Sequence, residues 1–406
     1  MSTSQASKNL IFLSILLAFT LYASFVLAAQ DVGPRYFIKT LNPFWQKSFG
    51  VRHNFDDGFT TDLSGIQLTL AKLFGVEVEP VAQLHILSEV PADEKIAVKP
   101  SKTGPVPTRP IPSDQTPWGI ETVYNDSLIA STSGGIDINV AVLDTGVLKS
   151  HPDLKNRVKQ CKDFTNLKFP IKDGSCDDKH GHGTHVSGII LADGGSDKLG
   201  IYGVAPGANL FSYKVCGNDG SCWADDIAFA LRTAADNGAN VVNISLGADS
   251  DSSLIRDAIN YVVSKDVLVV AAAGNDGPYP ASIDYPAANF KVVAVGAIDV
   301  NILVSDWSSR GINSSTSPYI VEEKDMEFGA PGVNVESTWK NGGYAILSGT
   351  SMASPHVAGL TAKLWQATAL EGTRASASRD LLHRLAKDIW TAGDDDATGF
   401  GLSQVK

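Results

Sequence analysis

Three short motifs, far apart along the chain, contain residue types that nucleophilic or acid–base catalysis uses. The first places the carboxylate of Asp144 directly after the apolar run Val140–Leu143. The second, residues 180–188, has three histidines among glycines, and the third, residues 349–359, has Ser351 after a Gly-Thr pair. A carboxylate, an imidazole and a hydroxyl are therefore available, and they can act together only if the surrounding helices and strands bring them close to one another.

Asp144 is predicted to lie at the carboxyl end of a buried parallel strand, where open α/β sheets gather their catalytic groups. The triplet Asp-Thr-Gly at 144–146 also suggests an aspartic protease, but that chemistry needs two carboxylates that share a proton. Neither a second Asp-Thr-Gly nor an Asp-Ser-Gly occurs in the chain. The sequence therefore disfavours an aspartic mechanism, and an aspartate that merely ends a strand is the remaining alternative.

The histidine motif is predicted to begin a helix, because Val186, Ile189 and Ile190 fall on one helical face. Three clustered histidines could instead bind a metal ion. In the His-Glu-x-x-His metal motif the histidines are four residues apart and a Glu lies between them. Here His182 and His185 are three residues apart and that Glu is absent, so a metal site is disfavoured.

Ser351 is predicted to begin a helix, with its hydroxyl beside the positive helix end, which would stabilise a developing oxyanion. Pro355 fits the first turn of that helix, where its missing N–H costs nothing. Asn275, directly after the buried run Ala271–Ala273, would supply a preorganised amide donor. Taken singly, a helix cap and a turn-forming Asn remain the alternatives for these two residues.

Composition excludes several classes of protein. The chain has 406 residues, 43% of them hydrophobic and 19% charged, which excludes a disordered chain and a coiled coil. With 33 Lys+Arg and 44 Asp+Glu its net charge is 33 − 44 = −11, which argues against nucleic acid as the main partner. Residues 30–112 hold 9 basic and 9 acidic residues, whereas residues 113–406 hold 23 and 35, so the acidity belongs to the larger part.

The first 28 residues are predicted to be a signal peptide. Lys8 is the only charge there, the apolar stretch Leu10–Ala28 follows, and small residues precede Ala29. An uncleaved membrane anchor is the alternative, because the stretch approaches the roughly 20 residues that span a bilayer. We expect a secreted, extracellular product that has no stable membrane association once the signal is cleaved.

Export makes disulfides possible, and the four cysteines allow three pairings. Cys161 and Cys176 are 15 residues apart, and Cys216 and Cys222 are 6 apart. Pairing between these neighbours is our prediction, and buried free thiols are the alternative. A zinc site is disfavoured because no Cys-x-x-Cys occurs.

Residues 35–90 have the pattern of a small α+β unit, with a strand at 36–38, a helix at 66–74 and a strand at 76–80. A Pro-rich linker follows. Beyond Trp118 short apolar runs alternate with helical segments, which predicts a parallel sheet covered on both faces. The runs are Ile138–Leu143, Leu210–Val215, Val241–Leu246, Val267–Ala273 and Val292–Ala297, and the helices include Ala224–Asn237 and Ser253–Lys265.

Together the three motifs and the segment around Asn275 resemble motifs of the subtilisin family of serine proteases, in the chain order Asp, His, Ser. Further matches are Ser245-Leu246-Gly247 and the stretches 203–206 and 328–332, so the resemblance extends from about Gln115 to Val405. It implies an α/β fold, namely a three-layer α/β/α domain with a mostly parallel central sheet. A small α+β, ferredoxin-like propeptide would precede that domain.

The resemblance also implies the roles of individual residues in peptide-bond hydrolysis. Ser351 would be the nucleophile, His182 the general base and then general acid, and Asp144 the group that orients the histidine. The Asn275 side chain and the Ser351 backbone N–H would form the oxyanion hole. This set predicts a serine endopeptidase that works through an acyl-enzyme.

In this family the substrate binds as an extra strand between two edge segments. Here these would be Asp219-Gly220-Ser221 and Ser245-Leu246-Gly247. Asp284 stands where simple members have a glycine at the floor of the primary specificity pocket. It suggests a preference for Lys or Arg on the acyl side of the cut, unless the carboxylate points elsewhere or binds an ion.

Calcium is the one cofactor that the resemblance implies, and no organic cofactor is expected. Oxygen ligands in exported, Asp-rich loops suit this ion. Asp153 and Asp197 match the family's strong site, in which Leu199 and Ile201 would contribute backbone carbonyls. Gln115 would complete the site, although its spacing to the following proline is one residue shorter than usual.

The amino-terminal piece fits a propeptide that assists folding and inhibits the enzyme until it is cut away. We predict a signal peptide at 1–28, a propeptide at 29–98, a Pro-rich linker with the processing site at 99–117 and a catalytic domain at 118–406. The cut should fall within Ala97–Asp114.

The expected partners are protein or peptide substrates and the chain's own propeptide, and the mature enzyme is expected to be a monomer. A catalytically inactive member of the family that only binds, and an extracellular metal-binding protein built on the histidines, are the competing functions.

Overall fold

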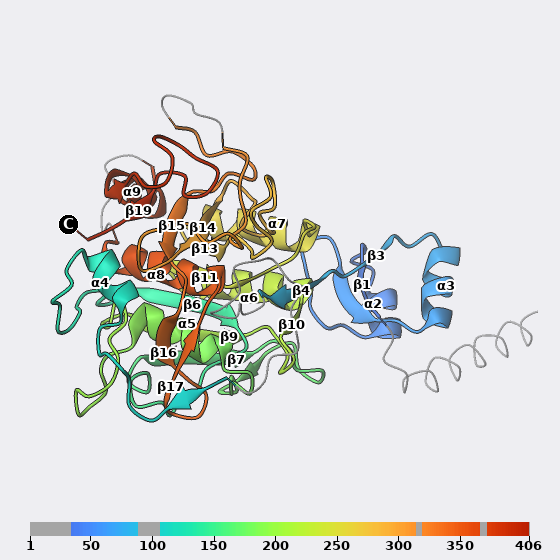
Figure 1. The fold of residues 1–406 in the computed structure, drawn as a ribbon. Helices are drawn as coiled ribbons and strands as arrows, with labels where there is room; N and C mark the ends of the chain where they lie inside the picture. Colours follow the sequence, from blue (N-terminus) through green and yellow to red (C-terminus); the bar gives the residue numbers. More distant parts are fainter. Residues whose placement is uncertain (1–33, 88–105, 314–318, 366–371, 406) are drawn as a thin grey trace, which may run out of the picture. The chain divides into compact units, whose positions relative to one another are not determined.

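The computed structural model describes residues 34–87, 106–313, 319–365 and 372–405 (Figure 1). The chain forms two compact units, Met1–Ala82 and Gln83–Lys406. The predicted signal peptide and residues 88–105, which include the first part of the predicted linker, lie outside the described residues. Among the helices that the structure describes, none is long and apolar enough to cross a membrane.

The amino-terminal unit is a small antiparallel sheet, in the order β2-β1-β3, with two helices. Its side chains Ile38, Phe49, Phe59, Leu63 and Ala71 form a separate core. A capping box between Ser64 and Gln67 fixes where α3 begins. The elements are β1 (Arg35–Ile38), α2 (Pro43–Phe49), β2 (Phe59–Asp62), α3 (Gly65–Leu73) and β3 (Val78–Pro80).

An eight-stranded sheet forms the centre of the larger unit, in the order β15-β14-β13-β11-β6-β9-β7-β8. All neighbours pair in parallel except β7 and β8, so the predicted, mostly parallel sheet is confirmed. The strands are β6 (Asn139–Asp144), β7 (Val158–Asp163), β8 (Lys172–Asp173), β9 (Asn209–Lys214), β11 (Val241–Ile244), β13 (Leu268–Ala272), β14 (Val292–Ile298) and β15 (Phe328–Pro331).

Helices cover both faces of this sheet and complete the three layers (Figure 1). Helices α5 and α8 pack against each other, and so do α6 and α7. The buried residues of β6 alternate between the two layers, so that Val140 and Val142 belong to the core beneath α5 and α8. The helices are α4 (Trp118–Tyr124), α5 (His182–Leu191), α6 (Ala224–Asp236), α7 (Ser253–Ser264), α8 (Thr350–Lys363) and α9 (Arg374–Arg384).

Three small sheets lie outside the central one. Their orders are β10-β4-β12, β16-β17-β5 and β18-β19. Strand β4, which the sequence pattern suggested as part of the small unit, instead pairs with two strands of the larger unit. The strands are β4 (Gln83–Ile86), β5 (Thr108–Arg109), β10 (Ser221–Trp223), β12 (Leu246–Gly247), β16 (Val335–Thr338), β17 (Tyr344–Leu347), β18 (Ala386–Lys387) and β19 (Leu402–Ser403).

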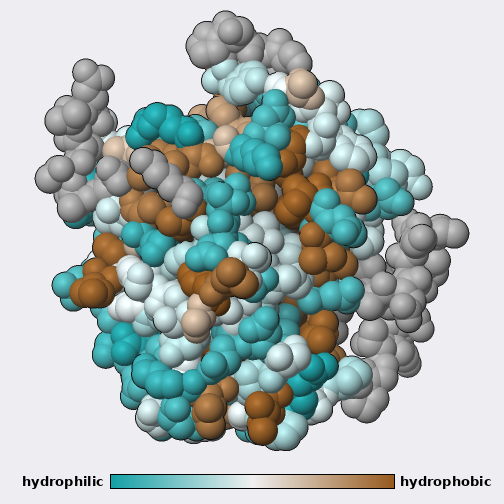
Figure 2. All heavy atoms as spheres, turned by 60° about the vertical axis from the view of Figure 1, so that its left-hand side comes forward, coloured by the Kyte–Doolittle hydropathy of each residue, from teal (hydrophilic) through white to brown (hydrophobic). Residues whose placement is uncertain are grey.

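Both predicted disulfides are present, between Cys161 and Cys176 and between Cys216 and Cys222. Their Cα atoms are 5.2 Å and 4.2 Å apart, and no free cysteine remains among the described residues. On the face in Figure 2, hydrophobic residues lie in several patches separated by hydrophilic ones.

Candidate active site

The strand–helix arrangement brings Asp144 and His182 into direct contact. Asp144 is the last residue of β6 and His182 the first of α5, and both are fully buried. His182 Nδ1 lies 2.9 Å from each carboxylate oxygen of Asp144. Because a carboxylate only accepts, this contact places the ring proton on Nδ1 and leaves Nε2 as the basic nitrogen.

The turn that follows β6 allows unusually close backbone contacts. A Cβ added at Gly183 would lie 2.3 Å from the Gly146 carbonyl oxygen and 3.0 Å from Asp144 Oδ1. One added at Gly146 would lie 2.2 Å from the Cys176 carbonyl oxygen. The Thr145 hydroxyl accepts the Gly183 N–H at 2.9 Å, which ties the strand end to the helix start. Glycine is therefore required at both positions.

A second carboxylate, Asp178, holds the start of the histidine helix. Its oxygens accept the backbone N–H groups of Gly181 at 2.7 Å and Thr184 at 2.9 Å, and the Thr184 hydroxyl at 2.6 Å. This satisfies donors that a helix start leaves without partners. The Cys161–Cys176 disulfide closes only two residues earlier and fixes the approach to α5.

The other two histidines of the motif have different surroundings. The fully buried His185 donates from Nε2, which lies 3.1 Å from the carbonyl oxygens of Val335 and Ala345. Since carbonyls only accept, Nε2 carries the proton, and burial lowers the pKa of His185 to about 3. Burial also lowers the pKa of His180, and the charge of His182 adds to that effect. Among the described residues, no group with metal-binding geometry includes any of the three histidines of the motif.

Ser351 lies in the first turn of α8 and is 1% exposed. Its hydroxyl donates to the Ser245 carbonyl at 3.1 Å, and the Ser245 hydroxyl donates to the Ser351 carbonyl at 3.0 Å. These reciprocal bonds join the nucleophile candidate to the segment just before β12. The start of α8 points its partial positive charge at the same place.

Asn275 is held with its amide beside the serine. Its Oδ1 accepts both the backbone N–H and the hydroxyl of Thr350, each at 3.0 Å. A Cβ added at Gly349 would lie 3.4 Å from Asn275 Nδ2 and 3.7 Å from the Ser351 backbone nitrogen. Both donors therefore border one small space, and a side chain at Gly349 would intrude on it. This is the arrangement that an oxyanion needs.

The two predicted edge segments lie on either side of a strand of the chain itself. β4 pairs antiparallel with β10 and with β12, with Ser221 opposite His85 and Gly247 also opposite His85. The Ile86 N–H donates to the Gly220 carbonyl at 3.0 Å. The structure thus brings both segments to the two sides of one extended strand, β4.

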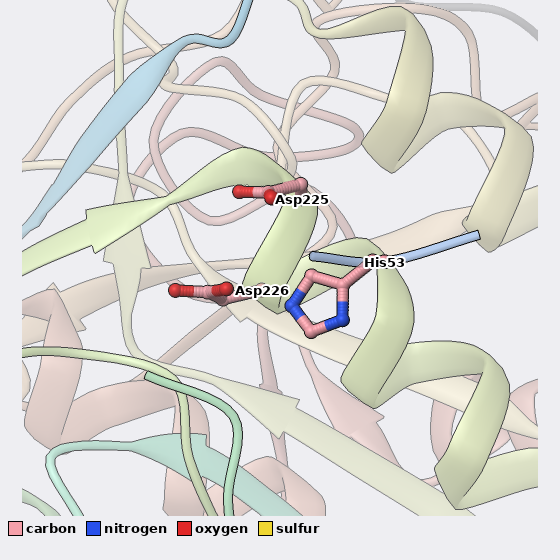
Figure 3. Close-up of side chains that lie close together, drawn as sticks. All are labelled: His53, Asp225 and Asp226. Atoms are coloured by element: carbon pink, nitrogen blue, oxygen red, sulfur yellow. The ribbon is translucent and has the colours of Figure 1, made fainter. Parts of the chain in front are cut away.

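A disulfide spans the first edge. The Cys216–Cys222 disulfide closes the loop that carries Asp219 and Gly220. α6 starts directly after β10, and Figure 3 shows Asp225 and Asp226 in its first turn, where carboxylates favour a helix start.

Asp284 is 3% exposed and packs between β12 and the end of β13. A Cβ added at Gly247 would lie 2.8 Å from Asp284 Cβ, and one added at Gly274 would lie 2.9 Å from Asp284 Oδ2. Burial, together with the carboxylates of Asp276 and Asp249, raises the pKa of Asp284 to about 8. The carboxyl group is thus mostly neutral at pH 7.

The predicted calcium ligands converge on one loop. Asp153 is 1% exposed, and its Oδ2 accepts the Ile201 N–H at 2.9 Å and the Tyr344 hydroxyl at 2.8 Å. Its Oδ1 is buried without a hydrogen-bond partner, and burial raises the pKa of this carboxyl. A Cβ at Gly195 would lie 3.0 Å from that oxygen and 3.2 Å from Asp197 Oδ1. These oxygens border the same space, which suits a hard divalent cation.

Gln115 reaches this loop despite its shorter spacing. Its carbonyl accepts the Tyr202 N–H at 2.8 Å, and its side-chain amide donates to the carbonyls of Lys198 and Gly200. The carbonyl of Ile201, one of the two predicted ligands, accepts the Gly194 N–H at 2.9 Å. The two residues whose carbonyls face Gln115, Lys198 and Gly200, are therefore next in sequence to the predicted ligands Leu199 and Ile201.

Sequence reasoning missed the residues that support the site. Asp178 lies just before a predicted helix start, which is a position typical of capping side chains. Lys214, at the end of β9, is buried and donates to the Thr145 carbonyl at 2.8 Å, and burial lowers its pKa. A lysine inside the apolar run Leu210–Val215 was the available signal.

Comparison with known proteins gives concordant matches. A model described as the subtilase family matches residues 135–401. A subtilisin of Bacillus sp. (strain TA39) is 45% identical over 379 residues, which cover 89% of this chain and 87% of that protein. Subtilisin BL of Lederbergia lenta is 41% identical over 254 residues, 63% of this chain and 86% of that protein.

Solved structures agree with these matches. The S41 psychrophilic protease superposes with a TM-score of 0.69 at 50% identity, covering 72% of this chain and 99% of the other. Sphericase gives a TM-score of 0.69 at 48% identity with the same coverage.

Proposed function

The chain belongs to the subtilase family and is a serine endopeptidase, and we propose that it hydrolyses peptide bonds through Asp144, His182 and Ser351. The observation that carries this proposal is the pair of 2.9 Å contacts between His182 Nδ1 and the Asp144 carboxylate. They hold the imidazole in the tautomer whose Nε2 can take the proton of a serine hydroxyl.

In the proposed reaction, Ser351 Oγ attacks the carbonyl carbon of the substrate while its proton passes to His182 Nε2. Asp144 stabilises the imidazolium that forms, and the same proton then goes to the leaving amine. Water, deprotonated by His182, hydrolyses the acyl-enzyme and regenerates Ser351. The tetrahedral oxyanion accepts hydrogen bonds from the Asn275 side chain and the Ser351 backbone N–H.

Substrates would bind as a strand between β10 and β12, in the cleft where β4 lies. We propose that β4 is the end of an inhibitory propeptide, so the chain is made as a self-processing zymogen. The solved relatives support a mature enzyme shorter than this chain, because 99% of each matches only 72% of it. The predicted signal at 1–28 would direct secretion before maturation.

Calcium is proposed as a structural ion. Asp153 and Asp197 would hold it through carboxylate oxygens, the loop at 198–201 through backbone carbonyls, and Gln115 through its side-chain oxygen. The ion would neutralise the buried Asp153 carboxylate and tie residue 115 to the loop. It takes no part in the proposed reaction.

A fluorophosphonate probe, which reacts with activated serines, tests the catalytic set directly. The mature enzyme should incorporate one probe at Ser351 and lose its activity on casein, and Ser351→Ala should take up none while remaining folded. Ser403→Ala is the matched control, because that buried hydroxyl also donates to a backbone carbonyl, 3.1 Å from Leu382 O. Unaltered casein hydrolysis by Ser351→Ala would refute the mechanism.

A further inference from the structure

Strand β4 lies in the cleft as a substrate would. It is antiparallel to both neighbours, with Leu84 opposite Cys222 on one side and Ile86 opposite Leu246 on the other. The Ile86 N–H donates to the Gly220 carbonyl at 3.0 Å. The register of this strand therefore fixes which of its peptide bonds comes next to the nucleophile.

The register places Leu87 opposite Ser245. In an antiparallel pair, one step forward on one strand is one step back on the other, so Leu87 follows Ile86 while Ser245 precedes Leu246. The Ser245 carbonyl is the acceptor of the Ser351 hydroxyl, at 3.1 Å. The backbone of Leu87 thus lies across from the residue to which the nucleophile is bonded.

Side-chain burial along the segment agrees with this register. Leu84 is 2% exposed and Leu87 is 9% exposed, whereas Gln83 and His85 are exposed. The segment is anchored by two leucines that are three residues apart. Substrates with an apolar residue just before the cut, and another three residues earlier, would fill the same positions.

We propose that the first self-cleavage breaks the peptide bond on the carboxyl side of Leu87, which rests on the proposed function. Ser351 Oγ forms the ester with the Leu87 carbonyl carbon, the C–N bond to residue 88 breaks, and its amine leaves with the proton from His182. One water then releases Leu87 as a carboxylate. This bond lies upstream of the predicted range Ala97–Asp114, so a cut in that range would be a second event.

The chain beyond the cut stays attached to the enzyme through β5. Arg109 pairs with Tyr344 and Thr108 with Ala345 in the sheet that contains β16 and β17. Arg109 Nε also lies 3.4 Å from the buried carboxylate of Glu336, which accepts the Ser113 N–H at 2.9 Å. The new amino terminus would therefore remain covalently part of the enzyme, while the part up to Leu87 can dissociate.

The test is a time course of maturation of the secreted full chain, with intact masses and amino-terminal sequencing of each product. The first products should be a fragment ending at Leu87 and an enzyme starting at Ser88. Leu87→Asp should slow this cut about 10-fold or more, because a charge replaces an apolar anchor. Leu87→Met is the matched control, because it keeps an apolar side chain at the same position, and it should mature at close to the normal rate.

A first enzyme product that starts within residues 97–114, or an unchanged rate for Leu87→Asp, would overturn the inference. Fluorophosphonate labelling and casein hydrolysis by the final product separate the two proposals. An enzyme that labels and hydrolyses but starts elsewhere refutes only the Leu87 assignment. A chain that neither labels nor hydrolyses casein refutes the proposed function as well.

Discussion

We expect replacement of Asp284 by Asn to remove a pH-dependent change in substrate preference. The pKa of Asp284 is raised to about 8 by burial and by the carboxylates of Asp276 and Asp249. Below pH 8 the carboxyl is neutral and an apolar side chain can lie against it. Above pH 8 it is ionised, and an arginine about 4 Å away would gain about 4 kcal/mol before desolvation is counted. We expect about 1–2 kcal/mol to remain, since desolvation offsets much of that gain.

The assay is the ratio of kcat/KM for two peptides that differ only in Arg or Leu before the cut, measured from pH 6 to pH 10. In the wild type the ratio should rise about 5- to 30-fold around pH 8, because each 1.4 kcal/mol is a factor of ten. In Asp284→Asn it should stay flat. Titration of the catalytic histidine affects both peptides alike and cancels in the ratio. A flat wild-type ratio, or the same rise in both proteins, would refute the reasoning.

The same pKa has a consequence for stability. A carboxyl whose pKa is raised on folding binds more protons in the folded state, so the free energy of unfolding falls as pH rises. The contribution is fully present below the unfolded value of 3.8 and is lost by pH 8. At about 1.4 kcal/mol per pH unit, the loss is about 6 kcal/mol. In a Ser351→Ala background, which prevents self-digestion, Asp284→Asn should resist urea better than its parent at pH 9 and by a smaller margin at pH 5.

Two other predictions concern the oxyanion hole and the ion. Asn275→Ala should lower kcat by about 10²–10³, or about 2.7–4 kcal/mol, while leaving KM nearly unchanged. This magnitude is carried over from subtilisin. An unchanged kcat with a raised KM would contradict the role. Chelation with EDTA should lower the melting temperature of the Ser351→Ala enzyme, and Asp153→Asn should lower it without EDTA and make it insensitive to the chelator. A melting temperature that EDTA does not change in the parent would exclude the calcium site.

The sequence predicted the sheet well because its central strands are buried on both faces. Continuous apolar runs marked β6, β9, β11, β13 and β14 within one or two residues. Strand β7, Val158–Asp163, has no such run, since its side chains are largely half-buried and include two lysines. A pattern search by hydrophobicity cannot find a strand of this kind, and only its pairing with β9 defines it.

The sequence could propose a catalytic set because the chemistry restricts residue types, whereas the supporting contacts depend on tertiary distances. Nothing in the order of residues places the Asp178 carboxylate on Thr184, or Lys214 on the Thr145 carbonyl. The same holds for Gly349, because the reason for a glycine there is the short distance from an added Cβ to Asn275 and Ser351. Such positions become visible only when the backbone is known.

The register of β4 and the protonation of Asp284 support each other. If Asp284 borders the space that the Leu87 side chain would occupy in the proposed first cut, an ionised carboxylate there would be buried without a counter-charge, which is costly. A neutral Asp284, hydrogen-bonded to Asp249, removes that conflict at pH 7. The acidic residue and the apolar maturation site are therefore compatible, provided that the first cut takes place below pH 8. On this reasoning Asp284 selects basic residues only in alkaline solution, and the pocket is apolar in character when the zymogen matures.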